Sequence, residues 1–164
     1  METLFSDLEG LRIAIDIETR GQEFYRQAAV YAKKAEHKDL FETLMNEESQ
    51  HRETFMKIYN KVKEQKDAFN DDYLFDADTS RYLTVLAEGH VFPDATKSAH
   101  KIAELDTVGA VLAAAIQAEK DSILFYDELA CHAKFEVARN IFELLKKEEQ
   151  GHVVKLRIVM DAWA

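Results

Sequence analysis

The sequence predicts an all-α fold, a four-helix bundle in which a long crossover with short helices joins two antiparallel helical hairpins. Three observations favour this fold: apolar residues recur three or four apart over long stretches, helix-breaking residues are few, and the chain contains an internal repeat. The 164 residues include one proline and five glycines, which leaves room for long uninterrupted helices. A chain of this length fits one domain, which we expect to span residues 1–164.

The first hairpin is expected over about residues 3–67. Its first helix runs to about residue 34, and Thr3 or Ser6 is a suitable cap for its start. A short polar turn follows, and a second apolar stripe continues to about residue 67. Because the turn is short, the two helices should lie antiparallel. The apolar stripe of the first helix consists of Leu4, Leu8, Leu11, Ile15, Phe24, Ala28 and Tyr31.

Residues 68–105 form the expected crossover, which begins with an acidic segment rich in turn-forming residues. A short helix is expected within residues 81–90. Pro93 then forces a break, because proline lacks the backbone N–H that a helix interior needs. A further short helical piece is expected from Asp94 to Leu105.

The second hairpin is expected over about residues 106–161. Asp106 and Thr107 suit the cap of a third long helix that ends near residue 132. The fourth long helix should run from about residue 134 to 161.

An internal repeat relates the two hairpins. A shift of 101 residues aligns residues 18–51 with residues 119–152 without a gap, and 12 of the 34 aligned positions are identical. A single duplication of this kind predicts a pseudo-two-fold pair of hairpins.

The repeat includes acids and histidines set among apolar neighbours. Glu48 and His51 are three residues apart, so they share one face of a helix, and Glu149 and His152 repeat that spacing. A single pair of this kind is usually a surface salt bridge. Two copies, each 30 residues after a lone glutamate on the preceding helix, favour a metal site instead. The six candidate metal ligands are Glu18, Glu48, His51, Glu119, Glu149 and His152.

The ligand types indicate which metals the site would hold. Four buried carboxylates repel one another, and divalent metal ions are the simplest compensation. Two histidines and four carboxylates, some of them bridging, match the two-metal sites of helical bundles. These ligands favour iron or manganese over copper. The residue types leave iron and manganese open at this point, with zinc as a further alternative.

Four further residues recur in the repeat and require interpretation. Tyr25 and Tyr126 each follow a lone glutamate by seven residues, which places them near the same helix face. They are either aromatic core residues, or they donate a hydrogen bond to a ligand or act as redox-active phenols near the metals. Glu47 and Glu148 point roughly 100° away from the ligand face, so we expect them to be solvated or salt-bridged.

The histidines outside the repeat pattern are His37, His90, His100 and His132.

The two E-x6-Y and two ExxH motifs resemble those of the rubrerythrin-like branch of the ferritin-like superfamily. The resemblance covers about residues 18–55 and 119–156, and the crossover segment YLTVLAEGHVFPD is similar to the connector of stand-alone members. It implies a diiron-carboxylate centre with the same six ligands. It also implies reactions of reduced iron with peroxide or dioxygen, and a homodimer.

The chain departs from the family pattern at two positions near the ligands. Rubrerythrins carry an additional glutamate three residues after the third-helix ligand, where this chain has Ser122, and the repeat mate Gly21 supplies no substitute. We therefore expect slow peroxide turnover, with dioxygen a comparable or better oxidant. Bacterioferritins have a haem methionine directly after the second-helix glutamate, where this chain has Ser49. Because no rubredoxin domain follows the bundle, an external electron donor or stored Fe(II) is expected.

Composition narrows the classes of partner. The net charge of −10 argues against nucleic acid and anionic lipid, which would be repelled. Cys131 is the one cysteine, so a disulfide within the chain and a multi-cysteine metal site are both excluded. No stretch approaches ~18 uninterrupted apolar residues and no signal peptide is visible, so we expect a cytoplasmic protein.

Three functions remain open at this point. The first is a diiron oxidoreductase that reduces dioxygen or peroxide. The second is an iron-binding or storage protein in which the same site is a ferroxidase. The third is a helical module in which the metal is purely structural.

Overall fold

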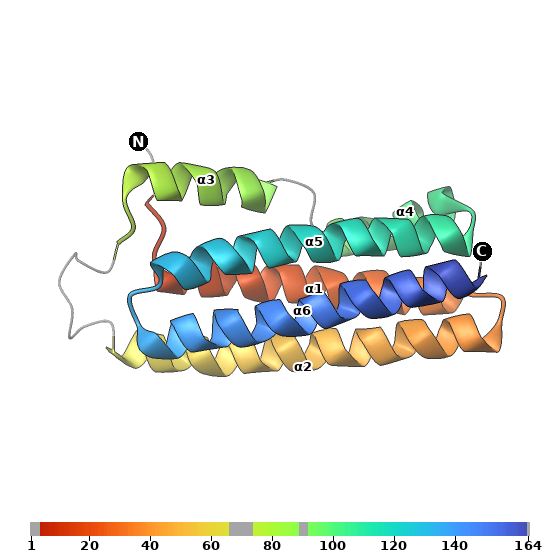
Figure 1. Ribbon diagram of the computed structural model, residues 1–164, viewed down its shortest axis with the longest axis horizontal. Helices are drawn as coiled ribbons and strands as arrows, with labels where there is room; N and C mark the ends of the chain where they lie inside the picture. Colours follow the sequence, from red (N-terminus) through yellow and green to blue (C-terminus); the bar gives the residue numbers. More distant parts are fainter. Residues whose placement is uncertain (1–3, 66–73, 89–91, 164) are drawn as a thin grey trace.

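The computed structural model describes residues 4–65, 74–88 and 92–163. Its long helices form two hairpins, and shorter helices occupy the crossover (Figure 1). The long helices are α1 (Asp7–Tyr31), α2 (Ala35–Gln65), α5 (Val108–His132) and α6 (Glu136–Trp163). The crossover contains α3 (Ala77–Glu88), the 3-10 turn η3 (Ala95–Lys97) and α4 (Ser98–Leu105).

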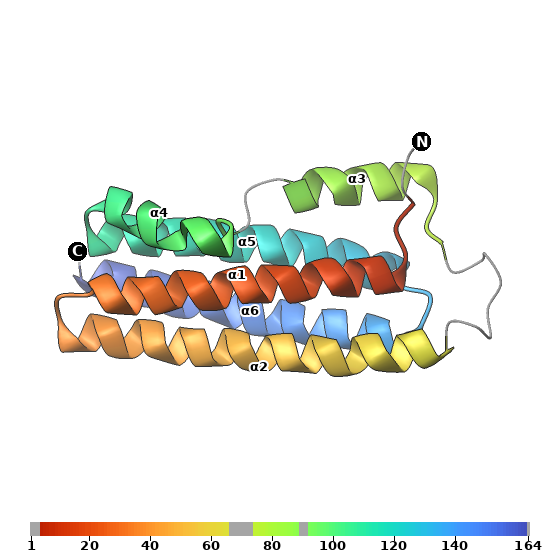
Figure 2. The ribbon, with the colours of Figure 1, turned by 180° about the vertical axis from the view of Figure 1, so that it is seen from behind.

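The prediction of an all-α bundle of two hairpins is confirmed. Helix α1 packs against α2, α5 packs against α6, and the two hairpins pack on each other. Helix α4 lies against α1 and α5, and α3 lies against α5. Figure 2 shows both short helices on the same side of the bundle, so the crossover covers one side of the hairpin pair.

Capping residues determine where the long helices begin. The Ser6 side chain accepts a hydrogen bond from Glu9 N at 3.1 Å, which confirms Ser6 as one of the two predicted caps and starts α1 at Asp7, a few residues later than the predicted position near residue 3. Thr107 caps α5 in the same way through Ala110 N at 3.1 Å, as the sequence predicts. The predicted break at Pro93 is present, because that residue lies outside any helix, between α3 and η3.

The hydrophobic core consists of two clusters, one in each half of the bundle length. One contains Phe55, Tyr126 and Phe142, and the other contains Tyr25 and Phe41. The four buried glutamates, together with His51 and His152, lie on the four long helices at the level between these clusters. The polar site therefore has an apolar layer on either side of it along the bundle axis.

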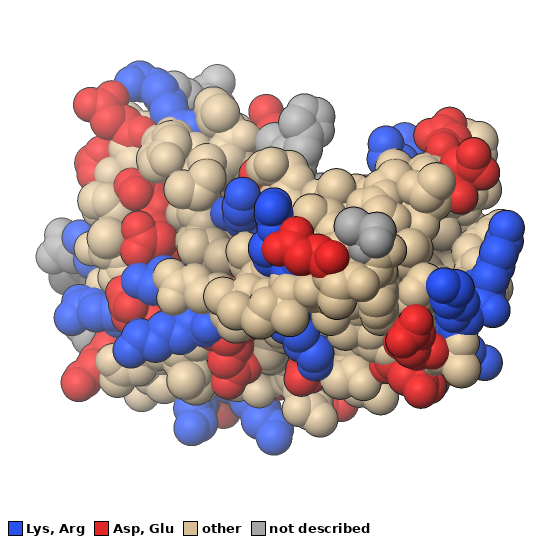
Figure 3. Space-filling model, turned by 45° about the vertical axis from the view of Figure 1, so that its right-hand side comes forward, with Lys and Arg blue, Asp and Glu red and all other residues tan. Residues whose placement is uncertain are grey.

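Acidic and basic side chains are interspersed over the face that Figure 3 shows. Among the described residues, no helix is both long enough and apolar enough to cross a membrane.

Candidate metal centre

The residues that the sequence singled out come together at one level of the bundle. The four glutamates are at most 1% exposed and the two histidines are 6% exposed. Each long helix contributes at this level, because α1 and α5 each supply one glutamate while α2 and α6 each supply a glutamate and a histidine. The site residues are Glu18, Glu48, His51, Glu119, Glu149 and His152.

Potential ligand atoms form two overlapping groups of four residues. Within each group the potential ligand atoms lie within 4.8 Å of one another. Both groups include Glu48 and Glu149, so these two carboxylates lie between the halves of the site. Two overlapping groups that share two carboxylates indicate a site for a pair of metal ions. The first group is Glu18, Glu48, His51 and Glu149, and the second is Glu48, Glu119, Glu149 and His152.

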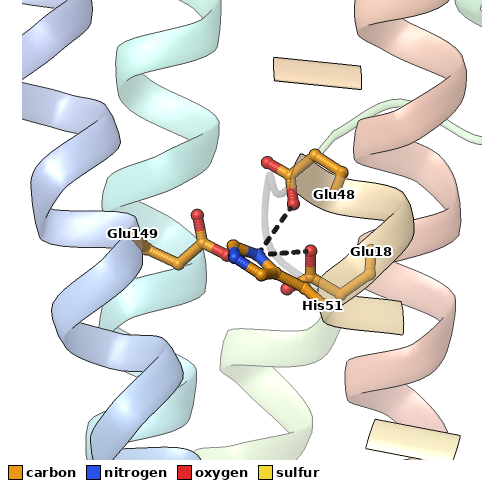
Figure 4. A group of neighbouring side chains, drawn as sticks. All are labelled: Glu18, Glu48, His51 and Glu149. Atoms are coloured by element: carbon orange, nitrogen blue, oxygen red, sulfur yellow. Dashed lines mark hydrogen bonds and ion pairs between the residues drawn. The ribbon is translucent and has the colours of Figure 1, made fainter. Parts of the chain in front are cut away.

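The first group is drawn in Figure 4, where its side chains point toward one another from α1, α2 and α6. His51 Nδ1 lies 3.4 Å from Glu18 Oε2 and 3.5 Å from Glu48 Oε2. The same nitrogen lies 2.9 Å from Glu149 Oε1. The His51 ring thus directs Nδ1, and not Nε2, at the three carboxylates of its own group.

The second group repeats this arrangement. His152 Nδ1 lies 3.3 Å from Glu119 Oε1, 2.8 Å from Glu149 Oε2 and 3.5 Å from Glu48 Oε1. The two imidazole rings lie 5.5 Å apart between centroids and are nearly parallel, with an interplanar angle of 18°. The site therefore has the pseudo-two-fold symmetry that the repeat predicts.

The outward nitrogen of each histidine pairs with a glutamate of the other hairpin. His51 Nε2 lies 2.6 Å from Glu148 Oε2, and His152 Nε2 lies 2.9 Å from Glu47 Oε2. Both contacts are ion pairs by distance, and neither has the geometry of a hydrogen bond. Both glutamates are partly exposed and salt-bridged, which agrees with the sequence interpretation, but their partners were not foreseen. The sequence signal for these contacts is that a glutamate directly precedes both Glu48 and Glu149.

Each buried tyrosine reaches across the bundle to a glutamate of the other hairpin. Tyr25 Oη donates to Glu119 Oε1 at 2.7 Å, and Tyr126 Oη donates to Glu18 Oε1 at 2.5 Å. Burial raises the pKa of both phenols well above its ordinary value, and the nearby carboxylates add to that effect. Both phenols therefore keep their protons and act as donors.

Burial and mutual repulsion divide the four carboxyl groups into two kinds. Burial raises the pKa of Glu48 and Glu149 well above its ordinary value, and the neighbouring carboxylates raise it further. Burial acts in the same direction on Glu18 and Glu119, but hydrogen bonds from their neighbours outweigh it. The pKa of Glu18 is lowered, and that of Glu119 is lowered to about 2.

The two imidazoles are held in their charged form in the absence of metal. Burial by itself lowers the pKa of His51 and His152, but hydrogen bonds to the site carboxylates outweigh it and raise both above the ordinary value. The two imidazolium groups offset carboxylate charge, and the raised pKa of Glu48 and Glu149 favours their neutral forms. Both effects lower the net negative charge of the site.

The donor set fits a pair of metal ions. Each of the four glutamates keeps one buried oxygen that makes no hydrogen bond. Buried polar atoms without a partner are uncommon in native proteins, and here they converge on one small region. Oxygen ligands from carboxylates and Nδ1 of neutral imidazoles are the donors that first-row metal ions accept. The unsatisfied oxygen atoms are Glu18 Oε2, Glu48 Oε1, Glu119 Oε2 and Glu149 Oε2.

One side of the centre is closed by the crossover. An added Cβ at Gly21 would lie 3.0 Å from Phe92 Cε2 and 3.4 Å from Glu48 Cδ, so the ring packs directly over this glycine. The Phe92 ring also lies 5.4 Å from that of Phe24 and 5.5 Å from that of Tyr25. Gly21 thus leaves room for an aromatic ring beside the site.

Ser122, the repeat mate of Gly21, is buried one turn beyond Glu119. Its Oγ donates to Ala118 O at 3.1 Å, so the hydroxyl is satisfied within its own helix.

The remaining histidines lie away from the site or outside the described residues. His100 and His132 pair with glutamates one turn away on their own helices. His37 is buried at the far end of α2. His90 lies outside the described residues.

Fold and site together define a ferritin-like helical-bundle protein with a buried Glu/His centre of the kind that holds two iron ions. The family model described as Rubrerythrin matches residues 9–104 and 110–163. The chain therefore belongs to the rubrerythrin family. No curated protein and no solved structure matches it.

Proposed function

We propose that this chain is a diiron-carboxylate oxidoreductase that reacts with peroxide or dioxygen. The observation that carries the proposal is the pair of overlapping ligand groups with Glu48 and Glu149 in common. Glu48 and Glu149 would be available to both metal ions, whereas the other four residues would each be available to one. The proposed ligands are Glu18, Glu48 and His51 from the first hairpin and Glu119, Glu149 and His152 from the second.

The proposal names iron because the donors are oxygen and imidazole and because the family points to it. These ligands suit iron or manganese better than copper, and zinc is a further alternative. Two reduced iron ions, when bound, would supply the electrons that reduce peroxide or dioxygen. An external electron donor would then be needed for turnover, and we expect the protein to act as a homodimer.

The residues around the proposed ligands would position them. Glu47 and Glu148 hold the outward nitrogen of each imidazole, which keeps Nδ1 directed at the centre. Tyr25 and Tyr126 keep the proton on Oη and donate a hydrogen bond to Glu119 and Glu18, respectively. These contacts cross between the hairpins, so they also fix the distance between the two halves.

Metal content tests the site. Protein purified without oxygen and loaded with Fe(II) should contain two ions per chain, located at the centre by anomalous scattering. Glu18→Ala and Glu119→Ala should each lower that stoichiometry by about the same amount, because the two halves are equivalent. Glu42→Ala is the matched control, since Glu42 is a partly exposed glutamate of α2 that pairs with Lys38. Wild-type protein that binds neither Fe(II) nor Mn(II) would contradict the proposal.

Rapid mixing tests the chemistry. Reduced, iron-loaded protein is mixed with peroxide or dioxygen at matched concentrations, and iron oxidation is followed optically. Oxidation within seconds supports an oxidoreductase, whereas an inert site points to a structural metal. Sedimentation distinguishes iron storage, which requires a large hollow assembly.

A further inference from the structure

A cavity of about 420 Å³ opens at the end of the bundle where α1 passes into α2 and α4 passes into α5. This is the right-hand end of Figure 1, where the C-terminus lies. The volume is within the range of small-molecule sites. The cavity is lined mainly by apolar side chains, and it contains no residue of the metal centre. Its aromatic walls are Tyr31, Phe41 and Trp163, and its polar residues are Lys33, Lys34, His37, Asp106 and Thr107.

The opposite end of the bundle contains a carboxylate that has no counterpart here. Asp7, the first residue of α1, is 1% exposed. Its carboxylate accepts hydrogen bonds from Lys134 N, at 3.0 Å to each oxygen, and from Phe135 N at 2.7 Å. These two residues lead into α6, so Asp7 satisfies amides that the helix itself leaves unpaired.

In the 101-residue repeat, Asp7 aligns with Val108, and the amide donors Lys134 and Phe135 align with Lys33 and Lys34. The correspondence is structural as well, because the residues before Asp7 and Val108 both cap their helices through a side-chain oxygen. Valine has no acceptor. Among the described residues, no group accepts a hydrogen bond from the amides of Lys33 and Lys34. Val108 and both lysines line the cavity, so the missing carboxylate would lie within it.

His37 is a second sign of an absent partner. It is 7% exposed, it lines the cavity, and its Nε2 makes no hydrogen bond. The nearest carboxylate oxygen, Glu36 Oε1, is 3.8 Å away, beyond hydrogen-bonding distance. The ring packs instead on that of Trp163, at 3.9 Å between centroids. A buried ring nitrogen without a partner is unfavourable unless a ligand supplies one.

The charge at the cavity favours an anion. Lys33 and Lys34 are both exposed, and neither forms an ion pair within the described part of the chain. Asp106 is the single acidic residue among those lining the cavity. Two ammonium groups against one carboxylate leave a positive balance there. Figure 3 shows acidic as well as basic side chains at the right-hand end of the view, so the positive balance belongs to the residues that line the cavity.

We propose that this cavity binds a small organic carboxylate with an apolar, ring-sized body. Its carboxylate accepts hydrogen bonds from the backbone amides of Lys33 and Lys34, as the Asp7 carboxylate does from the equivalent amides at the other end. Its body packs against the aromatic walls, next to Trp163. The site is separate from the metal centre, and its test does not depend on the reaction proposed there.

Trp163 is the one tryptophan of the chain, so its fluorescence reports directly on the cavity. Metal-loaded protein is titrated with phenylacetate and with two comparator compounds. Acetate has the carboxylate without the aromatic ring, and benzyl alcohol has the ring without the charge. We expect a saturable fluorescence change with phenylacetate, at an affinity about tenfold or more above that of either comparator.

Val108→Asp supplies the missing carboxylate from within the chain. The variant should bind phenylacetate at least about tenfold more weakly than wild type. Its melting temperature without ligand should rise, because the amides of Lys33 and Lys34 gain an acceptor. Val108→Thr is the matched control, since it keeps the shape of the side chain without the charge, and it should retain binding.

Three results would overturn the proposal. Tight phenylacetate binding by Val108→Asp and equal affinity for benzyl alcohol are the first two, because either would show that the amides take no part. The third is the lack of any saturable response to phenylacetate at millimolar concentration. If the wild-type protein then sediments as a dimer in which Trp163 is shielded from a soluble quencher, a second copy of the chain is the occupant.

Discussion

At the scale of single residues, two equivalent positions beside the metal centre have different surroundings. Gly21 leaves space that Phe92 fills, whereas the hydroxyl of Ser122 bonds to the backbone of its own helix. Neither residue supplies an oxygen atom to the centre. A longer acidic side chain at position 122 would start one turn beyond Glu119, at the edge of the same site.

Ser122→Glu should therefore raise the rate at which peroxide oxidises the reduced, iron-loaded protein, by roughly tenfold or more. For the wild type we expect slow oxidation by peroxide and a comparable or faster reaction with dioxygen. The measurement is stopped-flow absorbance with each oxidant at matched concentration. Ser122→Gln is the control for size, because it has the same length without the charge. Peroxide oxidation of the wild type orders of magnitude faster than dioxygen oxidation would show that the missing glutamate is unimportant.

The two tyrosine hydrogen bonds should contribute equally to stability. Tyr25→Phe removes the donor to Glu119 Oε1, and Tyr126→Phe removes the donor to Glu18 Oε1. Each change should lower the free energy of unfolding by about 1.5–3 kcal/mol, as expected for a buried bond to a charged acceptor. Urea denaturation of the metal-loaded protein measures both. A loss below the error of the measurement would mean that the phenols are only core residues.

At the scale of elements, the two hairpin turns differ in how their helix starts are satisfied. Asp7 reaches from α1 to the amides before α6, whereas no side chain among the described residues accepts a hydrogen bond from the matching amides before α2. The turn between α5 and α6 is thus capped by Asp7, whereas the equivalent turn between α1 and α2 borders a cavity. Helix starts are held by such acceptors because the first four N–H groups have no partner within the helix.

Asp7→Ala should lower the free energy of unfolding by about 1–2 kcal/mol through the loss of this cap. Hydrogen exchange should speed up most at the amides of Lys134 and Phe135, which lose their acceptor. Asp16→Ala is the control on the same helix, since its ion pair with Arg20 is largely exposed and contributes little. Equal losses in the two variants would contradict a specific role for Asp7.

At the scale of the whole molecule, the four long helices meet around the proposed metal centre, whose buried carboxyl groups repel one another. Metal held by these groups would link the four helices, and its removal would leave only the hydrogen bonds and ion pairs between them. We expect the melting temperature to fall on chelation, by about 10 °C relative to protein with metal at about a thousand times its Kd. Differential scanning calorimetry with verified metal removal measures this. An unchanged transition would mean that the carboxylates make no contact with metal.

Metal binding should also release protons. The pKa of His51, His152, Glu48 and Glu149 is raised in the metal-free protein, which favours the protonated form of all four groups. Metal ligands must be deprotonated. Loading two divalent ions should then release about two protons from the imidazoles, and more from the two carboxyl groups to the extent that these are protonated.

The affinity for metal should consequently rise with pH, since protons compete for the same atoms. Titration in weakly buffered solution with a pH indicator counts the protons directly. Release of no more than one proton per pair of ions would show that the groups are already ionised before metal binds.

Much of the fold was predictable from the sequence because the relevant signals are local. Apolar spacing marks the long helices, and the cap at Thr107 and the break at Pro93 require only neighbouring residues. The repeat also placed Glu48 next to His51, and Glu149 next to His152, on inward faces, because a helix has a fixed period. That these residues ligate metal stays a prediction until metal is measured.

Contacts between the hairpins were decided only by the tertiary structure. The partners of Glu47 and Glu148 are histidines about 100 residues away, and each tyrosine reaches a glutamate of the other hairpin. Such pairs depend on how far apart and at what level the helices pack, and helical periodicity contains no information about either. The ring of Phe92 over Gly21 and the cavity beside Val108 arise in the same way, from segments that meet only when the crossover folds back on the bundle.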